Sequence, residues 1–447
     1  MKEKIYKSRL VGFGRNMTNK NIKAVVLAAG KGTRMKSAVA KVLQPIFNKP
    51  LLGYVLDAIE KTGDVEETFV IVGHQAEDVE GFVEKNYSNA KCVLQMPQLG
   101  TGDAVAKVVP FLKNYNGDLL IICGDTPLIT TETLNEFFAF HKDSKNAITL
   151  MSVEYENPTG YGRVVRDVEG NLKKIVEEKD ADENTKKIKE VNAGIYCINW
   201  NLIAPVFSEL KNNNAQKEYY LTDIIEWANE KGLKNNTYVL KCADEIFGIN
   251  SKRQLAEATR ILNERTLNKL MDAGVTIVDP ISTFISPETV IGADTIVFPN
   301  TFINGKNIIG KNCKIGPMAH IRDGAEIGDN VRIGNFVEIK KSKIASNTNV
   351  SHLSYVGDAQ LGERVNIGAG TITANYNSQT KVKSQTIIED GASIGSNTVL
   401  VAPVKMGKNS MTGAGTIVTK DVEANALALT RTPLKLLKDW FKNKESN

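Results

Sequence analysis

The chain of 447 residues is longer than one hydrophobic core commonly supports, so its length predicts two or three domains. Lys and Arg outnumber Asp and Glu by 56 to 51, a mild net charge of +5 that excludes the strongly basic profile of a nucleic-acid-binding protein and leaves small anionic substrates open. The five cysteines form no CxxC pair and no metal-binding spacing, which predicts a cytoplasmic, reducing location.

The N-terminal stretch, MKEKIYKSRLVGFGRNMTNK, contains basic residues but no apolar h-region, so it does not have the form of a secretory signal. We interpret residues 1–21 as an N-terminal extension, a tag or an upstream start, with Met17 as a candidate start of the natural protein. No apolar stretch approaches the roughly 20 residues of a membrane span, so we expect no stable membrane insertion.

Residues 22–250 alternate apolar runs with helical or loop stretches, which predicts a mainly parallel α/β domain with ligands at the carboxyl ends of its strands. The expected strands are IKAVVLA, TFVIVG, KCVLQ, DLLIICG, NAITLMSV and NAGIYCIN.

A glycine-rich turn, LAAGKGTRMKS, follows the first of these strands. It fits neither the dinucleotide fingerprint, which needs a third glycine where Met35 stands, nor the P-loop, which ends in Gly-Lys-Ser/Thr. Small residues still let backbone N–H groups approach a phosphate, and Lys31 and Arg34 add positive charge. The sequence alone leaves an ordinary glycine turn with solvated basic residues as the alternative.

Asp125 follows the expected strand DLLIIC at a second strand end. A carboxylate there, beside a phosphate-binding turn, suits Mg²⁺, which takes one or two carboxylates together with substrate phosphates. The alternative is a turn-forming role within the sequence GDTP.

Residues 251–274 predict a connecting helix. Ser251 and Gln254 have the spacing of a capping box, and Gly274 is expected to end the helix.

Beyond this helix the apolar period changes to six. Aliphatic side chains expected to point inward stand at Ile291, Val297, Ile303, Ile309, Ile315, Ile321, Ile327, Ile333 and Ile339 and then, after single-residue slips and one interruption, at Ile344, Val350, Val356, Leu361, Ile367, Ile388, Ile394, Leu400, Met406 and Val418. Such repeats stack short strands into a prism, so residues 275–433 predict a left-handed parallel β-helix. We expect the repeat glycines at its corners, at positive φ, and the polar interruption TANYNSQTKVKSQT as a protruding functional loop.

Motifs from about residue 22 to 433 together resemble one family. They are LAAGKGTRM, the Lys of KVLQPI, VLQMPQLGTGDA, CGDTPL, TGYGR, IVEEKDA and VNAGIY, then GNFVEIKKS, SHLSYVGD, NIGAGTITANYN and LTRTP. The set is similar to bifunctional N-acetylglucosamine-1-phosphate uridyltransferases and glucosamine-1-phosphate N-acetyltransferases. The resemblance implies an α/β nucleotidyltransferase (Rossmann-like) domain over 22–250, a linker helix over 251–274, a left-handed β-helix acetyltransferase domain over 275–433 and a C-terminal tail over 434–447.

For the first domain the resemblance implies substrates UTP and N-acetylglucosamine-1-phosphate, with Mg²⁺ held by Asp125 and Asn250. Gln95 and the Gly100-Thr101 turn are implied to recognise the uracil, and Lys41 the sugar phosphate. The full implied nucleotide and sugar set is Leu27, Ala28, Ala29, Gly30, Arg34, Lys41, Gln95, Gly100, Thr101, Gly162, Glu177, Asn192 and Asn250.

For the second domain the resemblance implies transfer of an acetyl group from acetyl-CoA to glucosamine-1-phosphate. His352 is the implied base and Glu338 its orienting partner. The implied glucosamine-1-phosphate residues are Arg322, Lys340, Tyr355, Asn366 and Lys381, and those for acetyl-CoA are Ala369, Asn375, Tyr376, Ser396, Ala414 and Arg431.

The resemblance also implies a homotrimer, with acetyltransferase sites between subunits. The sequence departs from the family pattern at Asp103, where a histidine is frequent, at Cys123, where an aromatic is common, and at Val39-Ala40, where Leu-Pro is usual. The short tail, LKLLKDWFKNKESN, predicts an amphipathic helix that caps the core, with membrane contact as the alternative, and its length leaves the completeness of the acetyl-CoA site open.

Two rival functions remain. One is a monofunctional nucleotidyltransferase with a structural or regulatory β-helix, against which His352, Glu338 and Asn375-Tyr376 argue. The other is a non-catalytic assembly subunit, against which Lys41, Asp125 and Asn250 argue.

Overall fold

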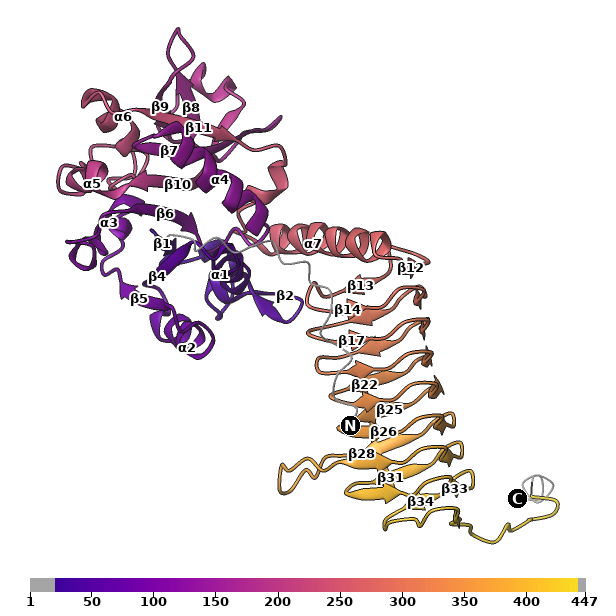
Figure 1. The fold of residues 1–447 in the computed structure, drawn as a ribbon. Coiled ribbons are helices and arrows are strands. Elements are labelled where there is room, and N and C mark those ends of the chain that lie inside the picture. Colours follow the sequence, from indigo (N-terminus) through magenta and orange to yellow (C-terminus); the bar gives the residue numbers. More distant parts are fainter. Residues whose placement is uncertain (1–20, 441–447) are drawn as a thin grey trace, which may run out of the picture. The chain divides into compact units, whose positions relative to one another are not determined.

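The computed structural model describes residues 21–440 and divides into two compact units, Met1–Ala258 and Thr259–Asn447 (Figure 1). The expected N-terminal extension, apart from Asn21, lies outside the described residues.

The first unit is built on a mixed sheet in the order β11-β7-β10-β6-β1-β4-β5, with β8 and β9 attached beside β10. The strands β1, β4, β5 and β6 run parallel, whereas β10 is antiparallel to both β6 and β7. Each expected apolar run forms a strand; β8, β9 and β11 are the strands of this sheet that the sequence analysis did not anticipate. The bounds are β1 (Ile22–Leu27), β4 (Val65–Val72), β5 (Ala90–Leu94), β6 (Asp118–Cys123), β7 (Ile148–Glu154), β8 (Arg163–Arg166), β9 (Leu172–Val176), β10 (Glu190–Asn199) and β11 (Asn235–Val239), with a separate pair β2 (Pro45–Ile46) and β3 (Lys49–Pro50).

Both faces of this sheet are buried, which explains why its central strands are continuous apolar runs. Along β1, Ala24 and Val26 belong to one apolar core and Val25 to the other. The first core takes side chains from α1 (Leu51–Thr62), α2 (Ala76–Asn86) and α4 (Thr131–Ser144), and the second from α3 (Thr101–Ala106), α5 (Trp200–Ile203) and α6 (Asp223–Glu230). Because β1 and β6 are parallel neighbours, their carboxyl ends lie side by side at one edge of the sheet.

The helix α7 (Lys252–Asp272) occupies the segment for which a connecting helix was expected. The Gln254 backbone N–H donates to Ser251 Oγ at 3.3 Å, which is one half of the expected capping box. The return bond is shifted by one residue, because Gln254 Oε1 accepts from the Asn250 N–H at 2.9 Å and not from that of Ser251. Gly274, at φ +91°, follows the helix as expected. The boundary between the two compact units falls inside this helix.

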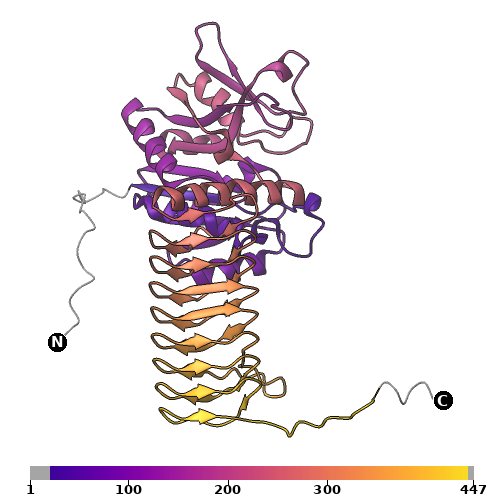
Figure 2. The ribbon, with the colours of Figure 1, turned by 90° about the vertical axis from the view of Figure 1, so that its right-hand side faces the viewer.

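In the second unit short strands stack into three parallel sheets, a parallel β-helix (Figures 1 and 2). The first sheet holds β12 (Thr276–Ile277), β15 (Ile296–Val297), β18 (Lys314–Ile315), β21 (Arg332–Asn335), β24 (Asn349–His352), β27 (Asn366–Ile367), β30 (Ser393–Ile394), β33 (Met411–Thr412) and β35 (Leu427–Ala428). The second holds β13 (Phe284–Ile285), β16 (Phe302–Ile303), β19 (His320–Ile321), β22 (Glu338–Lys340), β25 (Tyr355–Gly357), β28 (Ile372–Ala374), β31 (Val399–Val401) and β34 (Ile417–Val418). The third holds β14 (Val290–Ile291), β17 (Ile308–Ile309), β20 (Glu326–Ile327), β23 (Lys343–Ile344), β26 (Ala359–Leu361), β29 (Thr386–Ile388) and β32 (Val404–Met406).

Every aliphatic residue that the six-residue period placed inward is buried in one continuous core. Leu267 and Leu270 of α7 belong to the same core, next to Ile277 and Ile285 of the first coil. The buried Asn263 donates to the Thr283 carbonyl at 2.9 Å and accepts from the Ile285 N–H at 3.0 Å. The second half of α7 thus covers the first end of the β-helix core, and its Asn263 side chain satisfies backbone groups at the exposed edge of the first coil.

The expectation for the repeat glycines is wrong in most cases. Only Gly316 among the five that follow the early aliphatic residues has positive φ. Many left-handed corners carry Asp or Asn, with φ between 54° and 64° at Asp294, Asn300, Asn312, Asn330 and Asn347, although other repeat glycines such as Gly305, Gly324 and Gly370 do have positive φ. The glycines are needed for close approach instead: a Cβ on Gly334 would lie 1.8 Å from the Ser351 carbonyl oxygen of the next coil.

After the first coil, in which Thr276 pairs with Ile296, the coils differ in length at one corner only. In the next coils strand partners are 18 residues apart, as for Lys314 and Arg332. Two coils are shorter by one residue, as for Arg332 and Asn349, and across the expected loop the second sheet pairs Ile372 with Val399. Both the shortening and the insertion fall between a strand of the second sheet and the following strand of the third.

The described part of the tail departs from the expectation of a capping helix. Residues 431–437 have no regular structure, and Leu434, Leu436 and Leu437 are exposed. These side chains are not covered by any other part of the described chain, and a short helix without tertiary contacts is marginal in water. Residues 441–447 lie outside the described part. Over the range that the structure covers, no helix has the length and hydropathy to cross a membrane.

Candidate functional sites

A pocket of about 390 Å³ opens at the carboxyl ends of β1 and β6. Its wall is made by the glycine-rich turn after β1, the segment before and into α3, and Asp125 after β6. The residues implied for nucleotide or metal binding that line it are Leu27, Ala28, Ala29, Gly30, Lys41, Gln95, Gly100, Thr101 and Asp125. Lys31 and Cys123, the latter at a position where the sequence departs from the family pattern, line it as well.

Lys41 lies at the centre of the charged part of this pocket. Its ammonium forms an ion pair with Asp125 and donates to Asn250 Oδ1 at 3.1 Å. Gly32 explains how the turn reaches it: at φ +57° it adopts the left-handed conformation, and a Cβ there would lie 2.7 Å from Lys41 Cβ. The structure therefore brings together a lysine, a carboxylate and an amide from three distant segments.

The Asp125 and Asn250 oxygens converge on a single positive charge, so they fit a Mg²⁺ ion as its two protein ligands. Magnesium needs few protein oxygens because it retains waters and takes substrate phosphates. The described residues contain no cluster of three or more His, Cys, Asp or Glu side chains suited to a metal.

Gln95, which is 3% exposed, has its side-chain nitrogen fixed. Nε2 donates to Asp103 Oδ2 at 2.8 Å and to the Gly100 carbonyl at 3.0 Å. Asp103 in turn pairs with Lys107 Nζ at 2.9 Å. The sequence analysis singled out Asp103 as a departure without anticipating this contact.

Gly162, Glu177 and Asn192, the residues that the resemblance implies for the N-acetylglucosamine, also lie together. A Cβ on Gly162 would lie 3.5 Å from Glu177 Oε2 and 3.6 Å from Asn192 Cβ. Burial, followed by the nearby Asp180 and Asp223 carboxylates, raises the pKa of Glu177, although the nearby Thr222 acts in the opposite direction. Burial likewise raises the pKa of Asp223 to about 6.

The local surroundings of Arg34, of Val39-Ala40 and of Cys123 complete the description of this site. Arg34 is exposed in a short 3-10 turn (Thr33–Met35) and does not line the pocket. The Val39 carbonyl accepts from Gln44 Nε2 at 2.9 Å, which holds the loop that precedes Lys41. Burial raises the pKa of the Cys123 thiol to about 12.

In the second unit His352 heads a column of residues implied for acetyl-CoA. It ends β24 and pairs with Asn335 of the coil before, while the Asn397 N–H, one residue beyond Ser396, donates to the Ala369 carbonyl at 2.7 Å. A Cβ on Gly395 would lie 2.8 Å from Ala414 N, and one on Gly413 would lie 3.5 Å from Arg431 Nη2. Successive coils thus align His352, Ala369, Ser396, Ala414 and Arg431 along one corner.

The hydrogen-bond partner of His352 is Asn335, a residue that the sequence analysis missed. Nδ1 lies 2.8 Å from Asn335 Oδ1, and because an amide oxygen only accepts, Nδ1 carries the proton. Nε2 is then the basic nitrogen. Glu338, the implied orienting residue, bonds instead to Arg322 at 2.9 Å, and its orienting role stays a prediction.

A cationic cluster lies on the face formed by the second sheet. Arg322, together with burial and Lys383, lowers the pKa of Lys340, although Asp358 acts in the opposite direction. Asn375 Nδ2 donates to Asp358 Oδ2 at 2.5 Å and lies 3.5 Å from the Tyr355 hydroxyl. The structure therefore brings Lys383 to this cluster as well as the expected Arg322, Lys340, Tyr355 and Asn375.

The remaining implied residues are exposed. Tyr376 bridges Lys383 across the loop that the polar interruption forms, with the Asn377 N–H donating to the Val382 carbonyl at 3.0 Å. Lys381 is on this loop, and Asn366 begins β27 between Asn349 and Ser393.

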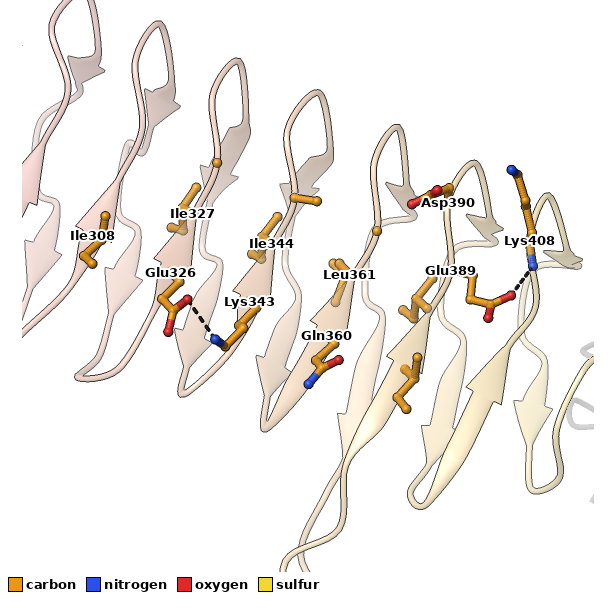
Figure 3. A pocket seen from close by; sticks show the side chains of 15 residues that line it. Ile308, Glu326, Ile327, Lys343, Ile344, Gln360, Leu361, Glu389, Asp390 and Lys408 are labelled. Carbon is orange, nitrogen blue, oxygen red and sulfur yellow. Dashed lines mark hydrogen bonds and ion pairs between the residues drawn. The ribbon is translucent and has the colours of Figure 1, made fainter. Parts of the chain in front are cut away.

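The third sheet carries a shallow groove of about 700 Å³, larger than the nucleotide pocket (Figure 3). None of the catalytic, metal or substrate-binding residues expected from the sequence lines it. Glu326 and Lys343 at its side are paired with each other at 2.9 Å. We assign no chemistry to this groove.

Comparison with known proteins identifies the two units separately. The family described as Nucleotidyl transferase matches residues 23–244, Bacterial transferase hexapeptide (six repeats) matches 308–341, and Hexapeptide repeat of succinyl-transferase matches 385–420. The chain is therefore a two-domain enzyme that joins a nucleotidyltransferase to a hexapeptide-repeat acyltransferase.

Curated relatives match both halves at once. Proteins named Bifunctional protein GlmU are 42% identical in Pelobacter propionicus and 43% in Heliobacterium modesticaldum, each over 94% of this chain and 98% of the relative. The one from Geobacillus thermodenitrificans is 43% identical over 91% of this chain and 95% of its own. The chain belongs to the GlmU family of bifunctional transferases, and the expected family is confirmed.

Proposed function

We propose that this enzyme makes UDP-N-acetylglucosamine in two steps. The second unit transfers the acetyl group of acetyl-CoA to glucosamine-1-phosphate, and the first unit then transfers a uridylyl group from UTP to the N-acetylglucosamine-1-phosphate. The observation that carries the proposal is the nucleotide pocket, in which Lys41 bridges Asp125 and Asn250 at a strand end.

In the uridylyl step a phosphate oxygen of the sugar phosphate attacks the α-phosphorus of UTP. The bond from the α-phosphorus to the bridging oxygen breaks, and pyrophosphate leaves with its electrons. No protein nucleophile is needed, because the sugar phosphate is one, so the protein contributes positioning and positive charge. Lys41 orients the sugar phosphate, the turn at Gly30 and Arg34 holds the triphosphate, and Gly162, Glu177 and Asn192 hold the sugar.

Asp125 and Asn250 would hold Mg²⁺, which supplies positive charge against the phosphates. When it binds, the Lys41 ammonium, which now pairs with both oxygens, becomes free to turn toward the substrate phosphate.

In the acetyl step the amine of glucosamine-1-phosphate attacks the thioester carbonyl. His352 Nε2 takes the proton of the attacking amine, the C–S bond breaks, and the protonated imidazole gives that proton to the departing sulfur, so that CoA leaves as a thiol. Arg322, Lys340 and Lys383 suit a phosphate dianion, and Asn375 and Tyr376 the amine and thioester. The acetyl-CoA chain would follow the Ala369, Ser396, Ala414 and Arg431 column.

The enzyme acts as a homotrimer in this proposal. His352 ends β24 of the first sheet and lies before the start of β25 in the second sheet. Lys340 and Asp358 lie at the far end of that second sheet, where β22 and β25 end, so one chain holds its base and its phosphate cluster apart. Beside His352 the corners are apolar, exposed and in the left-handed conformation: Phe336 is 55% and Leu353 61% exposed. A neighbouring copy covering this corner would bring the two halves of the site together.

One coupled assay tests the function in its assumed cellular setting, the cytoplasm. The enzyme with glucosamine-1-phosphate, acetyl-CoA, UTP and Mg²⁺ should release CoA thiol and pyrophosphate, and UTP consumption should require acetyl-CoA. If the enzyme uses UTP with supplied N-acetylglucosamine-1-phosphate yet never acetylates glucosamine-1-phosphate, the monofunctional alternative is correct. Sedimentation should give three chains, and Leu353→Ser with Phe336→Ser should dissociate them.

A further inference from the structure

The Gln95 amide in the nucleotide pocket has a single allowed orientation. Both acceptors that its nitrogen contacts, Asp103 Oδ2 at 2.8 Å and the Gly100 carbonyl at 3.0 Å, lack a hydrogen to donate. A flipped amide would set its own oxygen against both, leaving them without a donor. The Asp103 carboxylate is only 12% exposed and uses a different oxygen for each contact: Oδ2 accepts from Gln95, while Oδ1 pairs with Lys107 Nζ at 2.9 Å.

This orientation decides what Gln95 can offer to a nucleotide. Both hydrogens of Nε2 are used inside the protein, and none of the hydrogen bonds of the described residues ends on Gln95 Oε1. Because Gln95 lines the pocket, its remaining capacity is to accept one hydrogen bond. Uracil presents a donor at N3, whereas cytosine presents a lone pair there.

We propose that Asp103 is a positioning residue for base selection: by holding the Gln95 amide nitrogen it makes the pocket accept a pyrimidine with an N3–H and reject cytosine. The inference rests on the proposed uridylyl transfer and adds a residue where this chain departs from its family's frequent histidine. A cytosine ring would place its N3 lone pair against Oε1, an unpaired and repulsive contact.

A structural role for Asp103 makes a different prediction. Asp103 lies in the first turn of α3 and pairs with Lys107 one turn on, so its removal weakens a helix as well as the Gln95 contact. A loss of helix stability lowers activity with every nucleotide to the same degree. A loss of amide orientation changes the ratio between nucleotides.

The test measures kcat/KM for UTP and for CTP in the full-length enzyme with saturating N-acetylglucosamine-1-phosphate and Mg²⁺. Asp103→Ala should lower the UTP-to-CTP ratio by about tenfold or more, the factor that one ordinary hydrogen bond supplies. Asp103→Leu, which removes both carboxylate acceptors while keeping the side-chain bulk, should do the same. Lys107→Ala breaks the ion pair without touching Gln95 and should leave the ratio unchanged.

A second background separates direct from indirect effects. In Gln95→Ala the ratio should already be low, and adding Asp103→Ala should not lower it further, because Asp103 acts through Gln95. A ratio within about twofold of the parent in whichever Asp103 variant is folded by circular dichroism overturns the inference. A parent enzyme that uses neither UTP nor CTP would overturn the proposed function instead, so the two failures are distinct.

Discussion

Asp125 shows how one carboxylate can be tested for a metal role. Asp125→Asn keeps the shape and turn tendency of the side chain but removes its charge, and it also releases Lys41 from its ion pair. We expect uridylyl transfer to fall by at least roughly two orders of magnitude, because a bound metal stabilises phosphate charge by several kcal/mol. Steady-state assays across a Mg²⁺ titration check this.

Acetyl transfer by the same variant is the control, since its site lies in the other unit. Near-parent uridylyl transfer at saturating Mg²⁺ would contradict the ligand role and leave Asp125 as a turn residue.

His352 and Asn335 form a second pair whose roles can be separated. His352→Ala should cut acetyl transfer by roughly 10²- to 10⁴-fold, the usual contribution of a positioned base. Asn335→Ala keeps the base but frees its ring and tautomer, so kcat should fall by about tenfold, the value of one hydrogen bond, with KM little changed.

Uridylyl transfer should be unaffected in both variants. Acetyl transfer within about fivefold of the parent in His352→Ala is too small a loss for the removal of a base and would exclude that role.

At the scale of an element, α7 stabilises the β-helix through one side chain. Asn263→Ala leaves the Thr283 carbonyl and the Ile285 N–H buried without partners, each costing about 1–3 kcal/mol. We expect a lower melting temperature of the second unit by calorimetry. Asn268→Ala, on the exposed side of the same helix, is the matched control and should be neutral. Equal melting of the two variants would show that the edge finds other partners.

The helix α6 carries a pH-dependent cost at Asp223. Burial, then Glu226 and Asp180, raises the pKa of this carboxyl from 3.8 to about 6 in the folded protein. The folded state therefore binds the proton more tightly than the unfolded chain, so stability falls as pH rises from about 4 to 6 and stays lower above that.

Removing this carboxylate should relieve the cost. Asp223→Asn should raise the melting temperature of the first unit at pH 7.5, and the gain should vanish near pH 4, where the parent side chain is protonated. A gain that persists at pH 4 would point to a contact of the amide and not to proton linkage.

The sequence predicted elements well where a local pattern sufficed. The six-residue period placed each inward aliphatic residue correctly, because one position in a coil repeats the environment of the last. It misassigned the glycines, because the left-handed corners also accept Asn and Asp, whose short polar side chains tolerate that conformation. The tail helix was wrong over the described residues because an amphipathic pattern does not supply the surface it needs.

The candidate sites show the same limit. The strand-end positions of Gly30 and Asp125 followed from the parallel sheet, and resemblance supplied Lys41 and Asn250. The contact between Asn335 and His352 spans 17 residues and depends on coils shortened by one residue, which the period recorded only as slips. The Gln95–Asp103 bond depends on how a short helix sits against a strand end, which no local pattern specifies.

At the scale of the whole molecule, two compact units with separate apolar cores imply separable activities. A fragment ending near Arg265 should keep Mg²⁺-dependent uridylyl transfer and lose acetyl transfer. A fragment starting at Lys252 should fold and acetylate, because it retains Asn263, Leu267 and Leu270 at the end of the β-helix. One starting at Val275 exposes that end and should aggregate or melt earlier. Assays of both activities and calorimetry on the three fragments test these expectations. A first fragment that is folded but inactive would refute the domain assignment.

The corner between the second and third sheets has a consequence for protein engineering. Beyond the first coil the other two corners keep constant spacing, but this one loses a residue in two coils, gains a loop in the next and is shorter again in the last, while the strands stay paired on both sides. Loop-closure entropy grows slowly with length, so a foreign peptide grafted between Asn377 and Lys381 should be displayed without moving any strand. The stack thus provides a rigid carrier with one natural insertion point per chain along the described coils.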